Sequence, residues 1–172
     1  MPSISTQDSN TEFTKMNASL DEGTFERAAD RAIGAGYRLQ MTLIDLIDLT
    51  LQIQHLRWNL FDEPELRTQL TDLDALVRAG SEAVAQRLSD LGVAPDGTVG
   101  AVYRDLLFEP LPSGPFDAQR AANAFAPRLS QLDHRLEGSV AILADLDSVS
   151  ADIITTIAND VAAWSINLST AS

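Results

Sequence analysis

Residues 37–60, with the sequence YRLQMTLIDLIDLTLQIQHLRWNL, carry the strongest structural signal in the chain. Their apolar side chains recur at steps of three and four, which is the spacing of an α-helix. These side chains are Leu39, Leu43, Leu46, Ile47, Leu49, Ile53 and Leu56. The stretch contains no proline or glycine, and about 24 residues make a long helix for a globular protein. Because the apolar surface is wide, we expect this helix to be buried on more than one side.

The chain before this helix changes from polar to helical in character. Residues 1–20 are rich in Ser, Thr, Asn and Gln, which predicts a flexible tail ahead of a single folded domain at residues 21–172. Helical spacing of apolar residues begins at Phe25. Gly34 and Gly36 disfavour helix, so we expect a bend or break at these two positions.

A second helix is predicted to follow almost at once and to run to Leu91. Asp62 is placed to cap its start, and Pro64 suits its first turn. Gly92 then supplies a typical C-terminal stop. The helix carries apolar residues at helical spacing, so we expect it to pack against the first one.

The second half of the chain predicts two further helices after a long connection. Residues 93–115 contain four prolines and three glycines, and a short helix is expected within them at residues 99–108. A third helix is predicted at residues 116–146, with a kink at Pro127. A polar turn at residues 145–149 should lead into the last helix, at residues 150–168.

These elements predict an all-α fold. No segment alternates between apolar and polar residues as a strand does. Four long helices with one long connection between the second and third match the ferritin-like four-helix bundle. The short helix would lie within that connection.

Composition narrows the possible functions. The 172 residues include 12 basic and 25 acidic side chains, for a net charge of −13, and Lys15 is the only lysine. Such a chain should be repelled by the phosphates of DNA, so DNA binding is not expected. The absence of cysteine excludes thiolate metal sites and cysteine nucleophiles. We expect a cytoplasmic protein, because no signal peptide or membrane span is evident.

Four motifs resemble the Dps family of mini-ferritins, the DNA-protection-during-starvation proteins. Residues 43–49 followed by Arg57-Trp58-Asn59 resemble the first helix of that family, which ends in His-Trp-Asn. Ala85-Gln86-Arg87, then Leu91-Gly92 and Pro95-Asp96-Gly97, resemble its Ala-Glu-Arg, Leu-Gly-Gly and Pro-Asp-Gly stretch. Residues 151–153 with Trp164 resemble its last helix. The motifs occur in the family order and span most of the chain.

The resemblance implies a hollow shell of twelve subunits that oxidises Fe(II) and keeps the ferric mineral inside. It also implies an iron site between two subunits, built from His and Asp residues and an Asp-x-x-x-Glu pair. This chain departs from that pattern at most of the positions concerned. The family ligands are replaced at Arg57, Arg67, Thr71 and Gln86, and Glu82 alone keeps a carboxylate.

Whether the chain is a ferroxidase therefore stays open. Two arginines would repel Fe(II), and the remaining candidates for a metal ligand are Glu82 and Asp72. We hypothesise that Arg57, Arg67 and Glu82 form an ion-pair cluster that replaces the metal and holds the dimer interface. The alternatives are that both arginines are solvated, or that they build a pocket for an anion or small molecule.

Three aspartates and one tryptophan are further candidates for a role in the assembled shell. The resemblance implies cation pores lined by acids, for which Asp145, Asp147 and Asp152 are candidates, although helix capping explains such residues equally well. We expect Trp58 to lie in the core or in a subunit interface.

The two histidines lack the spacing of metal ligands. His55, on the buried helix, and His134, on the third helix, are predicted to have structural or surface roles. Asp45 and Asp48 should face a partner helix or water.

The sequence leaves three functions open. The first is an iron-sequestering Dps-like shell that acts against oxidative stress despite its altered oxidation site. The second is a shell without iron oxidation that serves as a structural or binding protein. The third is an enzyme or ligand-binding protein that uses a pocket at Arg57 and Arg67.

Overall fold

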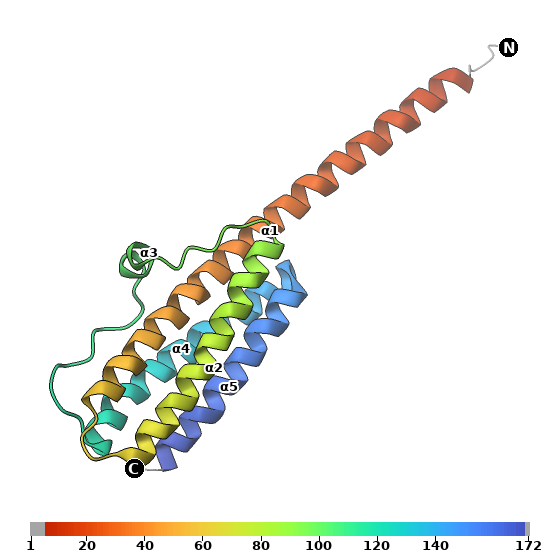
Figure 1. Cartoon of the computed structure of the whole chain (residues 1–172). Coiled ribbons are helices and arrows are strands. Elements are labelled where there is room, and N and C mark those ends of the chain that lie inside the picture. Colours follow the sequence, from red (N-terminus) through yellow and green to blue (C-terminus); the bar gives the residue numbers. More distant parts are fainter. Residues whose placement is uncertain (1–5, 171–172) are drawn as a thin grey trace.

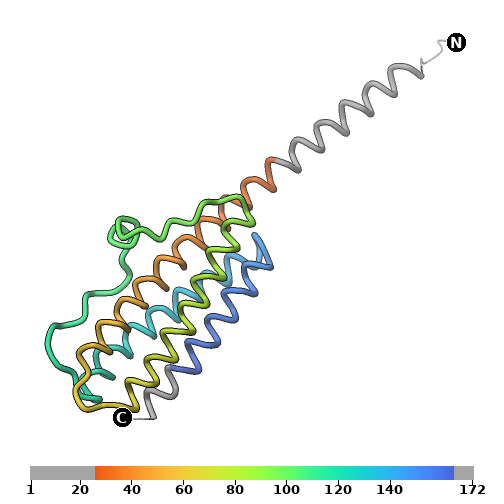
Figure 2. Tube along the Cα trace, in the orientation of Figure 1, coloured from red at the N-terminus to blue at the C-terminus, as the bar shows by residue number. Residues whose placement is uncertain are grey.

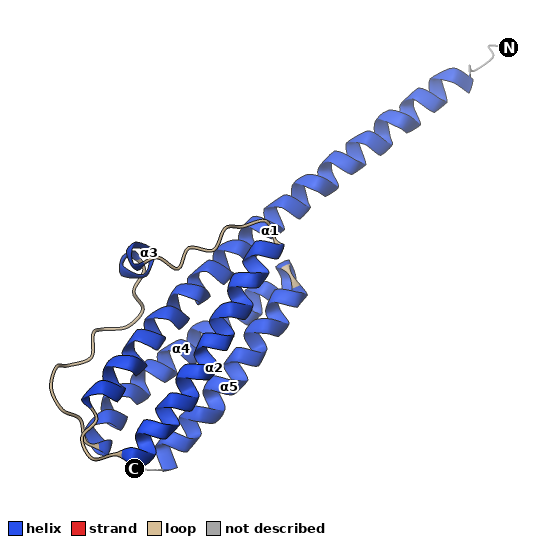
Figure 3. Cartoon of the chain, viewed as in Figure 1, coloured by secondary structure: helices blue, strands red, loops and turns tan. Residues whose placement is uncertain are grey.

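The computed structural model describes the backbone of residues 6–170 and the side chains of residues 26–164. Four long helices form an antiparallel bundle, and a short fifth helix lies outside it (Figure 1). The helices are α1 (Thr6–Asn59), α2 (Pro64–Asp90), α3 (Val99–Arg104), α4 (Ala118–Leu146) and α5 (Ser148–Thr170). Within the described part of the chain there is no strand, as Figure 3 shows, so the predicted all-α class is confirmed.

The connection between α2 and α4 crosses the whole length of the bundle. It leaves the end of α2, passes α3 beside α1, and reaches the opposite end of the bundle, where α4 begins (Figures 1 and 2). There the Phe116 amide donates to the Asn59 carbonyl at 2.8 Å, and the Phe61 amide donates to the Phe116 carbonyl at 2.9 Å. This is the single long crossover that the sequence predicts for a ferritin-like bundle.

A bend or break is predicted at Gly34 and Gly36, and the break is wrong, because α1 continues through both positions. The two glycines allow neighbouring side chains to approach the helix closely. A β-carbon at Gly36 would lie 2.9 Å from Cγ2 of Val93, and one at Gly34 would lie 3.1 Å from Cδ1 of Leu146. Close packing therefore explains these glycines better than backbone flexibility does.

Several helix ends also differ from the predictions. Glu63, not Asp62, precedes α2, and Asp62 instead adopts a positive φ of 56° in the tight turn. The short helix α3 ends at Arg104 rather than at residue 108. The polar turn predicted at residues 145–149 shrinks to Asp147, since α5 begins at Ser148. Terminal turns are the parts of a helix that local sequence specifies least.

The predicted flexible tail at residues 1–20 falls outside the residues whose side chains are described. Its mobility and the domain boundary at residue 21 therefore stay predictions. The side chain of Leu168, which we placed on the apolar face of the last helix, lies outside them as well. Among the described residues, no helix is long and apolar enough to cross a membrane.

The core runs along the centre of the four long helices. Leu39, Leu46 and Ile53 are fully buried, as the apolar stripe of residues 37–60 predicts. Near one end of the bundle, the rings of Phe125 and Trp164 pack edge to face with centroids 6.1 Å apart. Because α1 is buried on several sides, its polar residues face α2, α4 and the long connection.

Candidate functional site

The first of the polar regions lies where α1 packs against α2. Arg57, in the last turn of α1, forms an ion pair with Asp74 on α2, with its Nη1 atom 3.5 Å from Oδ2. Arg78, one turn further along α2, places Nε 3.1 Å from the same oxygen. Two guanidinium groups therefore share one carboxylate. The Nε atom of Arg57 and the Oδ1 atom of Asp74 are buried and have no hydrogen-bond partner.

Arg67 binds backbone rather than acids. Its Nη2 donates to the carbonyl of Leu60 at 2.7 Å, and its Nη1 donates to the carbonyl of Arg57. Carbonyls at a helix C-terminus lack intrahelical donors, so an arginine satisfies them well. Within one chain, then, the predicted cluster of Arg57, Arg67 and Glu82 does not form. Arg57 instead pairs with Asp74, an interaction that was not predicted from the sequence.

The side chains at the other two altered positions, Thr71 and Gln86, form hydrogen bonds within α2. The Thr71 hydroxyl donates to the carbonyl of Arg67 at 2.8 Å, and the Gln86 amide donates to Oδ1 of Asp90 at 2.8 Å. These are ordinary contacts between residues four apart on a helix. Neither side chain is oriented by a neighbouring helix, as a metal ligand usually is.

The two carboxylates proposed as metal ligands are both exposed and lie far apart. Asp72 and Glu82 are ten residues apart on α2, which corresponds to about 15 Å along the helix axis. They can share one ion only if they come from different subunits. In the part of the chain with described side chains, no group of three acidic or histidine residues could hold a metal ion.

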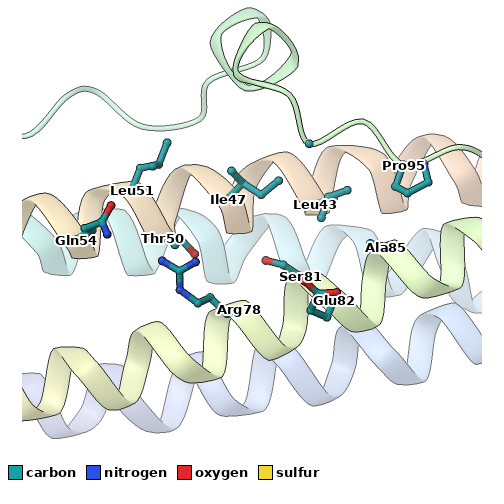
Figure 4. A pocket seen from close by; sticks show the side chains of 11 residues that line it. Leu43, Ile47, Thr50, Leu51, Gln54, Arg78, Ser81, Glu82, Ala85 and Pro95 are labelled. Carbon is teal, nitrogen blue, oxygen red and sulfur yellow. The ribbon is translucent and has the colours of Figure 1, made fainter.

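A groove of about 620 Å³ lies between α1, α2 and the start of the long connection (Figure 4). We call it the α1–α2 groove. Its volume is within the range of small-molecule sites. In Figure 4, α2 contributes a polar wall and the side chain of Arg78 reaches towards Thr50 on α1. The lining residues are Leu43, Ile47, Thr50, Leu51, Gln54, Arg78, Ser81, Glu82, Ala85, Pro95 and Gly97.

Asp45 occupies the opposite, α4-facing side of α1 and is almost completely buried, at 2% exposure. Its Oδ2 atom lies 3.0 Å from Nε of Arg135 on α4, while its Oδ1 atom has no partner. Burial raises the pKa of Asp45 from 3.8 to about 7, against the opposing effect of Arg135. The expectation that Asp45 faces a partner helix is confirmed.

Asp48 is buried one turn further along and holds the long connection in place. Its Oδ2 accepts from the backbone amide of Phe108 at 3.3 Å, and its Oδ1 accepts from Gln52 at 3.3 Å. Burial raises its pKa above the ordinary value despite these hydrogen bonds. Asp48 therefore faces the connection, and its role is explained by the fold alone.

The three candidate pore acids have different surroundings. Asp147 is bound by Arg87, whose Nη2 lies 2.7 Å from Oδ2, and by the hydroxyl of Ser150. Partial burial would raise the pKa of Asp147, but hydrogen bonds from Ser150 and Arg87 hold it below the ordinary value. Asp145 and Asp152 are exposed. Asp147 therefore ties the α4–α5 junction to α2, while the other two are free to line a surface.

The two histidines and Trp58 lie in three different environments. The Nε2 atom of His55 is buried without a hydrogen-bond partner, whereas His134 is exposed on α4. Trp58 is 74% exposed in the single chain, which removes the core alternative and leaves the subunit interface as its predicted location.

Sequence reasoning missed the acid and arginine partners that organise these regions. Asp74 and Arg78 have the four-residue spacing of a helical ion pair, so this contact could have been found. The contacts Arg57–Asp74 and Asp45–Arg135 join different helices, and Arg87–Asp147 joins α2 to the turn before α5. No spacing in a single helix reveals them.

The bundle, its single long crossover and the short helix beside α1 define the class of ferritin-like proteins. A curated relative, the DNA protection during starvation protein of Mycolicibacterium smegmatis, is 30% identical over 125 residues. The alignment covers 67% of this chain and 64% of that relative. No family model matches the chain.

Solved structures support the same assignment. Mycobacterium smegmatis Dps in its tetragonal form superimposes with a TM-score of 0.78 at 25% identity, over 81% of this chain and 87% of that one. Dps92 from Deinococcus radiodurans superimposes with a TM-score of 0.79 at 19% identity, over 82% and 87% of the two chains, which shows the shared fold. The chain belongs to the Dps family.

Proposed function

We propose that this chain is the subunit of a Dps-type shell that sequesters iron and contributes to oxidative-stress protection without the usual inter-subunit oxidation site. Iron is the cargo of such a shell rather than a resident cofactor. The fold and the family relationship support the proposal. Because the chain spans 64% of the length of the curated relative it matches, activity and assembly are both part of the proposal.

The observation that carries the proposal is the ion pair of Arg57 with Asp74. Arg57 stands where the family resemblance places the first histidine ligand. A guanidinium group remains protonated at physiological pH, so it offers no lone pair to a metal and repels Fe(II). The residues present at this position therefore do not fit an iron-oxidation site, and we derive no oxidation step there.

Iron would then be held by acids elsewhere in the assembled shell. Asp145 and Asp152 are exposed and suit a cation pore, whereas Asp147 is less suited because Arg87 already binds it. Glu82 and Asp72 remain candidate ligands if two subunits bring them together. A dodecamer would also cover the exposed indole of Trp58.

A second candidate function is a shell that binds a small molecule and no longer handles iron. The α1–α2 groove favours it, because it combines an apolar wall with Arg78, Ser81 and Glu82. Arg67 does not line this groove, so the pocket would differ from the arginine pocket predicted from sequence.

The decisive experiment is Fe(II) oxidation by oxygen and by peroxide, followed by absorbance and compared with a protein-free control. We expect the initial rate to equal that of the control, with iron retained in soluble form. A variant carrying Arg57→His, Arg67→His, Thr71→Asp and Gln86→Glu restores the family ligands. It should oxidise Fe(II) at least about tenfold faster, which corresponds to a barrier lower by about 1.4 kcal/mol.

Arg78→His is the matched control, because it adds a histidine beside the same acid without restoring a family position. Fast oxidation by the unmodified protein would contradict the loss of the site. Precipitation of the iron from the unmodified protein would contradict sequestration and favour the second candidate. Gel filtration with light scattering would test the dodecamer separately.

A further inference from the structure

A second groove, of about 300 Å³, lies between α1 and α4, away from the altered iron-site positions. We call it the α1–α4 groove. The lining residues include Arg38 and Asp45 on α1 and Arg135 and Gly138 on α4. Tyr37 and Asp45 are eight residues apart on α1, so the groove is about 12 Å long. That length suits a small organic molecule.

Arg135 lines this groove beside the buried Asp45. The two side chains form an ion pair in which Nε of Arg135 lies 3.0 Å from Oδ2 of Asp45. An arginine held through Nε keeps both terminal amino groups available to a second oxyanion. No hydrogen bond engages those groups among the described residues, and the side chain is 35% exposed. Asp45 therefore acts as a positioning residue for a partly exposed guanidinium group.

A second guanidinium group lines the same groove from the facing helix. Arg38, on α1, has no ion pair with any described residue, and its Cζ atom lies 6.0 Å from the centre of the Tyr37 ring. Two arginines against one aspartate leave the groove with a net positive charge, in a chain whose net charge is −13. Local positive charge of this kind favours an anionic ligand.

The shape of the groove depends on Gly138 in the middle of α4. Glycine in a helix interior is less favourable than alanine, so it needs a structural reason. Close packing does not supply one here, because a β-carbon at Gly138 would meet no atom within 4 Å. The missing side chain instead keeps the groove open beside Met41 and Ile142, which provide apolar walls.

We propose that the α1–α4 groove binds a small organic oxyanion, a carboxylate or a phosphate monoester. Its charged group lies between the guanidinium groups of Arg38 and Arg135. Its apolar body lies along Met41, Ile142 and the ring of Tyr37. The proposal is independent of iron handling, because none of these residues belongs to the Arg57–Asp74 region.

Isothermal titration of the full chain with benzoate and with phenyl phosphate tests this proposal. We expect at least one of them to bind with a dissociation constant below about 1 mM. Benzamide, which has the same ring without the charge, should bind at least about tenfold more weakly. Inorganic phosphate tests the need for an organic body and should also bind more weakly than phenyl phosphate.

Three variants distinguish binding in the α1–α4 groove from nonspecific attraction of anions to the protein. Arg135→Gln and Arg38→Gln should each weaken binding at least about tenfold. Gly138→Leu should abolish binding by filling the groove, and it favours helix, so the fold should be retained. Arg104→Gln is the control, since that arginine lies on α3 and is 69% exposed.

Four outcomes would overturn the proposal. They are the absence of binding by both anions, equal binding of benzamide, equal binding of inorganic phosphate, and unchanged affinity in Arg38→Gln and Gly138→Leu. Because Arg38 makes no ion pair among the described residues, its variant stays informative even if Arg135→Gln is unstable.

Discussion

The two polar faces of α1 use the same residue types in opposite surroundings. Towards α2, Arg57 and Asp74 are 30% and 15% exposed, and Arg78 shares the acid. Towards α4, Asp45 is 3% exposed at its side chain and has one arginine partner. Asp74 has two arginine partners, so the loss of either one leaves its charge paired. Burial makes the second pair sensitive to protonation and to the loss of either partner.

The largest expected effect is the pH dependence of stability at Asp45. Its pKa in the folded chain is about 7, against 3.8 in the unfolded chain, so folding takes up a proton between these values. The contribution to stability is fully present below pH 3.8 and is lost as the pH rises through 7. Relative to Asp45→Asn, the unmodified chain should lose about 3 kcal/mol between pH 5 and pH 8.

Urea denaturation at both pH values, monitored by circular dichroism, measures this difference. Asp72→Asn is the control, because Asp72 is exposed on α2. If the free energies of unfolding of Asp45→Asn and of the unmodified chain change in parallel with pH, then Asp45 does not titrate as described.

Removing one arginine from each face compares the two pairs directly. Arg135→Ala leaves Asp45 buried without its cation and should cost about 2 kcal/mol at pH 8, and less at pH 5, where Asp45 accepts a proton. Arg57→Ala should cost less than about 1 kcal/mol, since Asp74 keeps Arg78 as a partner. Equal losses in thermal or urea unfolding would remove the distinction between the faces.

The smallest effect on the chain itself is expected at Trp58. The side chain is 74% exposed, so Trp58→Ala should change the free energy of unfolding of the single chain by less than about 0.5 kcal/mol. If the indole lies in a subunit interface, the same variant should shift the assembly towards smaller species in analytical ultracentrifugation. Tyr103→Ala, at 78% exposure on α3, offers a comparison at another exposed aromatic residue.

The helices themselves follow from local patterns. The spacing of Leu39, Leu46 and Ile53 predicts their burial, and a long connection after α2 predicts the crossover. The errors lie where a neighbour decides the outcome. Gly36 was interpreted as a break because the packing of Val93 against it is not visible in the sequence. Asp62 was interpreted as a cap, although the turn places it at positive φ.

The candidate sites were less predictable than the fold. The resemblance of Arg57-Trp58-Asn59 to the family motif directed attention to Arg57, which lies in the last turn of α1 and contacts α2. Within the single chain Arg57 pairs with Asp74, because the choice between acids on α2 depends on how the two helices are aligned. The cluster of Arg57, Arg67 and Glu82 across a dimer interface stays a hypothesis. The α1–α4 groove was not predicted at all, since its residues come from two helices about 100 residues apart in the chain.

By itself, the sequence determined the all-α class, the number of long helices and the family. Helical periodicity and motif order are properties of neighbouring residues, so they can be read along one chain. Only the tertiary structure decided which charges meet. Arg57 with Asp74 and Asp45 with Arg135 are contacts between helices, set by helix alignment and by the burial that packing imposes. Burial also gives Asp45 a pKa near neutrality, which an aspartate in an unfolded chain would not have.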